Sequence, residues 1–193
     1  GDMNLGEQID ALRAPDGSYM SPTHIVGIGA SAGGLEALER FFASVPPTTG
    51  MAFVVIQHLS PDHKSLMVEL LSKHTLMRVC RVEEETVIAP DTVYVMSPKN
   101  NLVIENGKLR LSDRTPGHSS PLPIDLFFVS LAQCANESAV AVVLSGTGSD
   151  GARGLREVKA AGGLVLVQNE ETAKFDGMPR AAVATGLADA VLP

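Results

Sequence analysis

The chain has 193 residues, of which 45% are hydrophobic, and a formal net charge of −7. This length is enough for one sizeable core and short for two, so we expect a single domain. The acidic balance and the lack of a basic block argue against nucleic acid and against an anionic membrane surface as partners. No stretch approaches the roughly 20 apolar residues of a membrane span, so we expect a cytoplasmic protein without membrane insertion.

The two ends of the sequence and its cysteines indicate the domain organisation. Residues 1–22 are polar and have little apolar periodicity, which predicts a linker or an added segment ahead of a domain over residues 23–193. Gly1 ahead of Met3 indicates a domain taken from a longer protein. Cys80 and Cys134 lack C-x-x-C spacing, so we expect two thiols rather than a disulfide or a zinc site.

From His24 onward, short apolar runs alternate with amphipathic segments. Strands are predicted over 24–30 and 51–57, and helices over 34–45 and 63–75. Further continuous apolar runs lie in AVAVVLS and GGLVLVQ, which is typical of strands buried on both faces. The sequence therefore predicts an α/β fold with a parallel sheet that helices cover on both sides.

The middle of the chain departs from this alternation. It contains TVYVMS and then NLVIENGKLRLS, where Asn106-Gly107 in a period-2 context predicts a β-hairpin. The segment TPGHSSPLP is predicted as a loop, and PIDLFFVSLAQCANE as a helix that starts at a proline. A strand, a helix and a strand are expected after it.

Three polar residues lie after the carboxyl ends of predicted strands. Ser31 lies in the G-x-S-x-G run after the first strand, His58 follows MAFVVIQ, and Asp150 follows AVAVVLS within SGTGSDGARG. Ligands of open parallel sheets bind outside the carboxyl ends of the strands, so we expect all three at one edge. A serine, a histidine that removes its proton and an acid that orients the histidine form a nucleophilic triad.

Each of these residues also has a structural interpretation. Ser31 also suits the role of a small residue at a tight turn or a helix N-cap, and His58 that of a half-buried histidine at a strand end that donates to a carbonyl. Asp150 suits the N-cap of a helix that begins near Gly151, and Asp176 in FDGMPR is a rival acid.

Two kinds of ligand site compete with the triad as interpretations of these residues. Gly27, Gly29 and Ala32 fit the dinucleotide fingerprint G-x-G-x-x-A, but the second strand ends in Gln57 and His58 instead of the acid that binds a ribose. No G-x-x-x-x-G-K-[ST] run occurs. A zinc site built from the histidines at 58, 63 and 74 lacks both helical i, i+4 spacing and a cysteine partner, so we expect no metal.

The stretches IGASAGG, FVVIQHLSP, PIDLFF, VVLSGTGSDGA and KFDGMPRAA, in this order, resemble the catalytic domain of the chemotaxis protein-glutamate methylesterase (CheB) family over residues 24–193. The resemblance implies a doubly wound α/β fold. It assigns Ser31 as the nucleophile, His58 as the base and Asp150 as the third member of the triad. It also implies hydrolysis of glutamate methyl esters on chemoreceptors, glutamine deamidation as a side activity, and no cofactor.

By the same resemblance, the N–H of Ala32 and the region of Thr147 would bind the oxyanion. Well-known members have threonine and methionine at these two positions, so pocket shape and substrate preference are open. The receiver domain that regulates the usual member has no counterpart in these residues. QHLSPDHKS and LSGTGSDG resemble versions fused to a receptor methyltransferase and sensory domains, so the partner is a methylated chemoreceptor, another signalling protein or a further domain of the same chain. The alternative functions are a non-catalytic docking or regulatory module of a signalling protein and a nucleotide-binding α/β domain.

Overall fold

The computed structural model describes residues 4–11, 21–57, 66–113 and 122–193. Its centre is a seven-stranded sheet in which every neighbouring pair of strands is parallel, in the order β10-β9-β8-β1-β2-β5-β3. These strands are β1 (Ile25–Ala30), β2 (Ala52–Gln57), β3 (Arg78–Val82), β5 (Thr92–Met96), β8 (Ala139–Val143), β9 (Leu164–Gln168) and β10 (Ala190–Leu192). The predicted parallel α/β fold is confirmed.

The strand order makes the sheet doubly wound. The chain starts in the middle at β1, moves outward through β2 towards one edge, and then returns to β8 to build the other half through β9 and β10. The direction of winding therefore reverses between β1 and β8, which are hydrogen-bonded neighbours. In folds of this type, the crevice at such a reversal is the usual place for a ligand.

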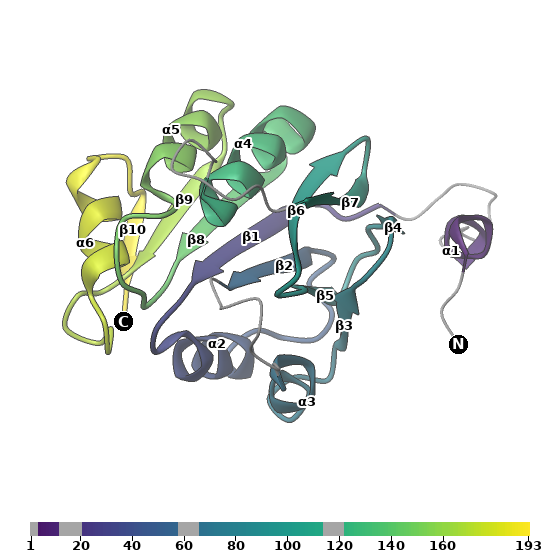
Figure 1. Cartoon of the computed structure of the whole chain (residues 1–193), viewed down its shortest axis with the longest axis horizontal. Coiled ribbons are helices and arrows are strands. Elements are labelled where there is room, and N and C mark those ends of the chain that lie inside the picture. Colours follow the sequence, from purple (N-terminus) through teal and green to yellow (C-terminus); the bar gives the residue numbers. More distant parts are fainter. Residues whose placement is uncertain (1–3, 12–20, 58–65, 114–121) are drawn as a thin grey trace.

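Helices cover both faces of the sheet (Figure 1), with α2 and α3 on one side and α4 and α5 on the other. Two buried apolar clusters, one per face, account for this arrangement. One includes Leu38 of α2 and Leu71 of α3, and the other includes Phe127 of α4 and Leu155 of α5. The helices are α1 (Leu5–Ala11), α2 (Gly34–Ala43), α3 (Met67–Leu71), α4 (Pro123–Ala135), α5 (Ala152–Ala160) and α6 (Gly177–Ala184), with a short 3-10 turn at Asn136–Ser138.

Helix α4 lies unusually close to β1 because β1 carries two glycines under it. A Cβ atom at Gly27 would lie 2.9 Å from Cε1 of Phe127, and one at Gly29 would lie 2.6 Å from Cγ2 of Ile124. Both distances are below ordinary carbon contact, so only glycine allows this approach. Gly27 and Gly29 lie inside β1, and side chains of α4 fill the space beside them. They are therefore not available to bind a phosphate, as the dinucleotide fingerprint would require.

A small antiparallel sheet has the strand order β4-β7-β6. Along the chain, β4 precedes β5, whereas β6 and β7 lie between β5 and α4. The strands of this sheet are β4 (Thr86–Val87), β6 (Asn100–Glu105) and β7 (Lys108–Asp113), and β6 pairs with β7 around Asn106 and Gly107. Both turn residues have positive φ, 52° and 74°, as a tight two-residue hairpin requires. The predicted hairpin is confirmed, but TVYVMS does not belong to the departure from the parallel rhythm, because it forms β5 of the main sheet.

Two other segments differ from the prediction. The helix expected over 63–75 is described only from 67 to 71, and His74 lies beyond it, where its Nε2 is 2.7 Å from Oε2 of Glu39. Within the predicted linker, Leu5–Ala11 form the helix α1. This helix contacts the domain, because Oε1 of Gln8 accepts a 2.7 Å hydrogen bond from the N–H of Val87 in β4. The loop predicted over 115–123 falls mostly outside the described residues. No helix among those described has the length and apolar character to cross a membrane.

The contact between β1 and α4 gives a first testable prediction. Gly29→Ala should lower the free energy of unfolding by about 1–3 kcal/mol, because the added methyl group forces the β-branched side chain of Ile124 to move within a packed core. Urea denaturation measures this change. The matched control is Gly6→Ala, an exposed position inside α1 where alanine is the better helix former. Equal stability of Gly29→Ala and the parent chain would contradict the argument.

Candidate active site

Ser31 lies at the reversal point of the sheet, directly after β1. Its backbone N–H donates a 3.0 Å hydrogen bond to the carbonyl of Ser145, which lies just beyond β8. Its own carbonyl accepts a 2.8 Å bond from Gly34, the first residue of α2. Gly33 makes the turn between them with a φ of 71°. The strand-turn-helix expected from the G-x-S-x-G run is therefore present.

Ser31 is 9% exposed, and its hydroxyl has two hydrogen-bond partners among the described residues. Its Oγ accepts a 3.0 Å hydrogen bond from the backbone N–H of Thr147 and donates to Sδ of Met178 at 3.4 Å. The N-cap residue of α2 is Gly33, and no side chain caps that helix. Ser31 thus does not serve as the helix cap that its sequence position also allowed.

Ser145 ties three loops together beneath the hydroxyl. Its Oγ donates to the carbonyl of Ala32 at 2.8 Å and accepts a 3.0 Å bond from the N–H of Phe175. Its N–H donates to Oε1 of Gln168, at the end of β9, at 2.8 Å. The loops after β1, β8 and β9 are therefore fixed to one another through Ser145, which is only 1% exposed.

Asp150 lies in the loop between β8 and α5 and is 5% exposed. Its Oδ2 accepts a 3.0 Å hydrogen bond from the N–H of Ile124, and its Oδ1 a 2.9 Å bond from the N–H of Asp125. Asp150 is therefore a helix cap, as one interpretation expected, but the helix it caps is α4. The N-cap position of α5, which that interpretation gave to Asp150, is occupied by Gly151.

Burial dominates the electrostatics of Asp150. It raises the pKa of this carboxyl to about 6, while the two N–H groups of α4 act in the opposite direction and the neighbouring charge of Asp125 adds to the rise. Burial also raises the pKa of Asp125, against the N–H bonds of Gly154 and Gly151. Both carboxyls bind a proton more readily in the folded protein than in the unfolded chain.

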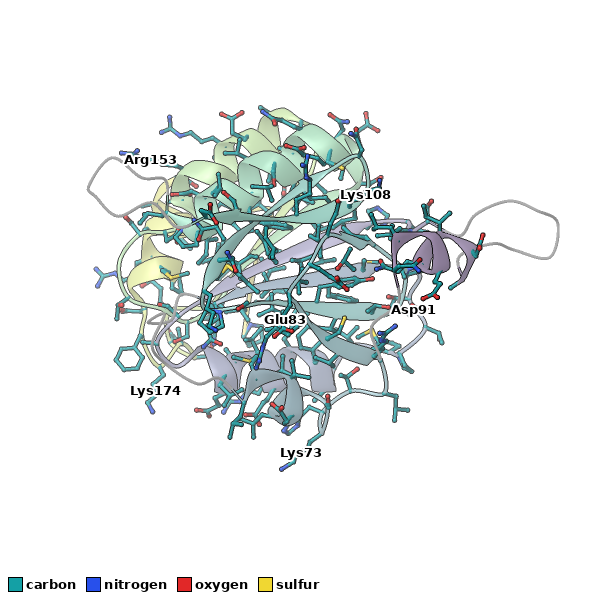
Figure 2. All side chains as sticks on the ribbon, turned by 45° about the vertical axis from the view of Figure 1, so that its right-hand side comes forward. Lys73, Glu83, Asp91, Lys108, Arg153 and Lys174 are labelled. Carbon is teal, nitrogen blue, oxygen red and sulfur yellow. The ribbon has the colours of Figure 1, made fainter. Side chains whose placement is uncertain are left out.

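A cavity of about 820 Å³ brings these groups together at the carboxyl ends of the strands. Ser31, Thr147 and Asp150 line it, and so does Ala32. At its margin stand charged side chains of α2 and of the loop before α6. One of them, Lys174, extends away from the ribbon in Figure 2, at the end of the sheet opposite Asp91.

His58 lies outside the described residues, so its predicted place in the triad stays a prediction. The residue before it, Gln57, ends β2, is buried and lines the same cavity. Among the described residues, its Oε1 has no hydrogen-bond partner. The rival acid Asp176 is exposed, and its carboxylate lies 3.8 Å from Nη1 of Arg180.

Several residues of the site were not expected from the sequence. Met178 contacts the serine hydroxyl, while Ser145 and Gln168 hold the loops around it. Gln168 had a visible signal, because it is a polar residue at the carboxyl end of an apolar strand, on the same edge as Ser31. Met178 lies within KFDGMPRAA, one of the stretches that carry the family resemblance, but nothing in that pattern indicated a contact with the serine.

The described groups define a class of protein, namely a doubly wound α/β domain with a buried serine and a buried aspartate at one cavity. The chain belongs to the CheB methylesterase family, whose family model, described as CheB methylesterase, matches residues 26–193. The resemblance expected from the sequence is thereby confirmed.

Relatives of known structure and sequence agree with this assignment. The crystal structure of the Thermotoga maritima CheB methylesterase catalytic domain superposes with a TM-score of 0.80 at 30% identity, over 88% of this chain and 92% of that one. A protein-glutamate methylesterase/protein-glutamine glutaminase of Pectobacterium atrosepticum is 34% identical over 90% of this chain and 50% of that protein. An uncharacterized 104.1 kDa protein of Rhodobacter capsulatus is 49% identical over 65% of this chain, which is 13% of that protein.

The buried Asp150 carboxyl predicts a pH dependence of stability. Its ordinary pKa is 3.8 and its folded value is about 6, so between these values the folded state holds a proton that the unfolded state has lost. Stability therefore falls as pH rises from about 4 to about 6, by about 2–3 kcal/mol from this group. Asp150→Asn should flatten that slope in urea denaturation measured from pH 4 to 7.

Asp176→Asn is the control for this experiment, because its carboxylate is exposed. It should keep the pH slope of the parent chain. A slope in Asp150→Asn as steep as in the parent chain would contradict the prediction, whatever the absolute stability of that variant.

Proposed function

We propose that this chain is a serine hydrolase that removes methyl esters from glutamate side chains of a chemoreceptor or another signalling protein, with release of methanol. The observation that carries the proposal is the position of the Ser31 hydroxyl, which is buried at the switch point of the sheet and bonded to a backbone N–H, in the same cavity as a buried aspartate. Membership of the CheB methylesterase family and the names of the relatives support the substrate class.

In the proposed reaction, Oγ of Ser31 attacks the ester carbonyl as its proton passes to a nitrogen of His58. A serine hydroxyl is a weak nucleophile without such a base. In the resting site this proton points to Sδ of Met178, a weak acceptor that gives it up easily. His58 follows β2 directly, and the preceding Gln57 already lines the cavity, which supports a base at this place.

Asp150 would orient His58 and stabilise its charged form. A carboxylate offers about four lone-pair sites, and the two N–H groups of α4 occupy one site on each oxygen of Asp150. Capacity for an imidazole N–H is therefore left. The same two bonds fix the carboxylate on a rigid helix end, which is the support that an orienting acid needs.

Negative charge develops on the ester oxygen during the attack, and in the proposed mechanism the N–H of Thr147 would donate to it. This N–H already lies 3.0 Å from Oγ of Ser31, and the N–H of Ala32 in the same cavity would be the second donor. The N–H of Ser31 itself is bonded to the Ser145 carbonyl and does not contribute.

The cycle closes in two steps. The proton on His58 moves to the departing methoxide, and methanol leaves an acyl-enzyme on Ser31. Water, deprotonated by His58, then attacks this ester, which gives the free glutamate carboxylate and restores the serine. A glutamine side chain would follow the same route with ammonia as the leaving group, which accounts for a deamidase side activity. No step calls for a metal or an organic cofactor.

The test is methanol release from methylated chemoreceptor membranes. Ser31→Ala and His58→Ala should lose about 10⁴-fold or more in rate, and Asp150→Asn slightly less, because the three groups act as one unit. Ser44→Ala is the matched control, since its hydroxyl donates to the carbonyl of Phe41 at the end of α2 and Ser44 is not among the described residues that line the cavity of Ser31. It should release methanol at the rate of the parent chain.

Labelling of the serine with a fluorophosphonate separates the other outcomes. Labelling of the parent chain without methanol release would keep the serine nucleophile and overturn the methyl ester substrate. Neither labelling nor release would overturn the hydrolase and favour a docking module.

A further inference from the structure

Asp125 is a buried acid that the proposed reaction does not use. It belongs to the first turn of α4, is 8% exposed and does not line the cavity. Burying a carboxylate costs free energy unless hydrogen bonds compensate it. The partners of Asp125 therefore indicate what it does.

These partners are the opening N–H groups of α5. Oδ1 of Asp125 accepts a 3.1 Å hydrogen bond from Gly151 and a 2.7 Å bond from Gly154. The first N–H groups of a helix have no partner within the helix, so this single oxygen satisfies two of them. Gly151 directly follows Asp150 and is the N-cap residue of α5, and Gly154 is the third residue of that helix.

The arrangement is reciprocal, because Asp150 caps α4 while Asp125 caps α5. Asp150 accepts from the N–H groups of Ile124 and Asp125, and Asp125 accepts from those of Gly151 and Gly154. Four buried hydrogen bonds thus join two helix ends through two side chains. Each carboxylate holds the backbone that carries the other one.

The close packing of α4 on α5 depends on the same region. A Cβ atom at Gly154 would lie 2.5 Å from Cβ of Phe128 and 3.1 Å from the carbonyl oxygen of Asp125. The first turn of α5 therefore rests directly on α4. Without the Asp125 acceptor, two N–H groups in this contact would be buried and unpaired, so the turn would shift and carry Asp150 with it.

We propose that Asp125 is a positioning residue for Asp150: through the N–H groups of Gly151 and Gly154 it fixes the place from which Asp150 faces the cavity. This inference rests on the proposed function for its kinetic consequence. Asp125 does not touch substrate, so its loss should lower kcat and leave KM nearly unchanged.

The experiment compares Asp125→Ala with Asp125→Asn. The alanine variant lacks the acceptor and should lose about 10²-fold in kcat, the size of effect that a misplacement of about 1 Å produces, with KM within about twofold of the parent chain. The asparagine variant keeps a side-chain oxygen for Gly151 and Gly154 and should stay within about threefold in kcat. If alanine prevents folding, Asp125→Ser replaces it, because its short hydroxyl cannot reach both N–H groups.

Val158→Ala is the control for lost stability. Val158 is buried in the same helix α5, beyond its first turn, and makes none of the four bonds. The Val158→Ala substitution should lower the melting temperature and leave kcat at the value of the parent chain. Three results would overturn the proposal: parent-level kcat in Asp125→Ala, an equal loss in Asp125→Asn, or an equal loss in Val158→Ala.

Amide hydrogen exchange separates this proposal from the proposed function. The N–H of Ile124 donates to Asp150, so its protection reports the place of that carboxylate without any turnover. Faster exchange at Ile124 in Asp125→Ala, but not in Val158→Ala, supports the positioning role even where the parent chain releases no methanol. Unchanged exchange in Asp125→Ala refutes it.

Discussion

The close contact between α4 and β1 is the constraint on which the site depends. Glycine at positions 27 and 29 lets the helix approach the central strand, and the N-terminus of the helix then ends beside the switch point. There its free N–H groups need an acceptor, which Asp150 supplies from the loop after β8. The packing of one helix thus decides where a buried carboxylate can be held at the cavity.

The carboxylates in turn depend on the helices. A buried acid without partners would be protonated or expelled, but a helix N-terminus offers both N–H donors and a partial positive charge. Asp125 and Asp150 each use one such terminus. Burial still dominates, since the pKa of both groups is raised. The site therefore combines rigid placement with a proton affinity well above that of an ordinary aspartate.

The sequence predicted the framework well because the framework follows from local patterns. Apolar runs, the Asn106-Gly107 turn and the proline at the start of α4 each act over a few residues, and all three appear as expected. Ser31 and Asp150 were found at one edge because parallel strands end on the same side. The prediction separated TVYVMS from the parallel sheet, although it forms β5 of that sheet. Strand order is a property of the whole sheet, and a single apolar run does not indicate which sheet a strand joins.

The parts that the sequence did not predict are contacts between distant loops. Met178 reaches Ser31 from α6, and Ser145 joins three loops, through pairings more than a hundred residues apart or across separate strands. The Asp150 carboxylate also caps a different helix from the expected one, because it accepts from the first turn of α4, a helix that ends earlier in the chain and packs beside α5 in the fold. Spacing along the chain contains no information about such pairings.

The structure indicates what the two departures from well-known family members, Ala32 and Thr147, change and what they leave unchanged. At position 147 the group that meets the Ser31 hydroxyl is the backbone N–H, and at position 32 the proposed donor is also a backbone N–H. A backbone donor survives a change of side chain as long as the loop keeps its path, and Ser145 and Gly146 hold that path through bonds to Phe175. The side chains of Ala32 and Thr147 therefore shape the walls of the cavity, which both residues line, while the proposed mechanism relies on their backbone N–H groups, which any side chain leaves present.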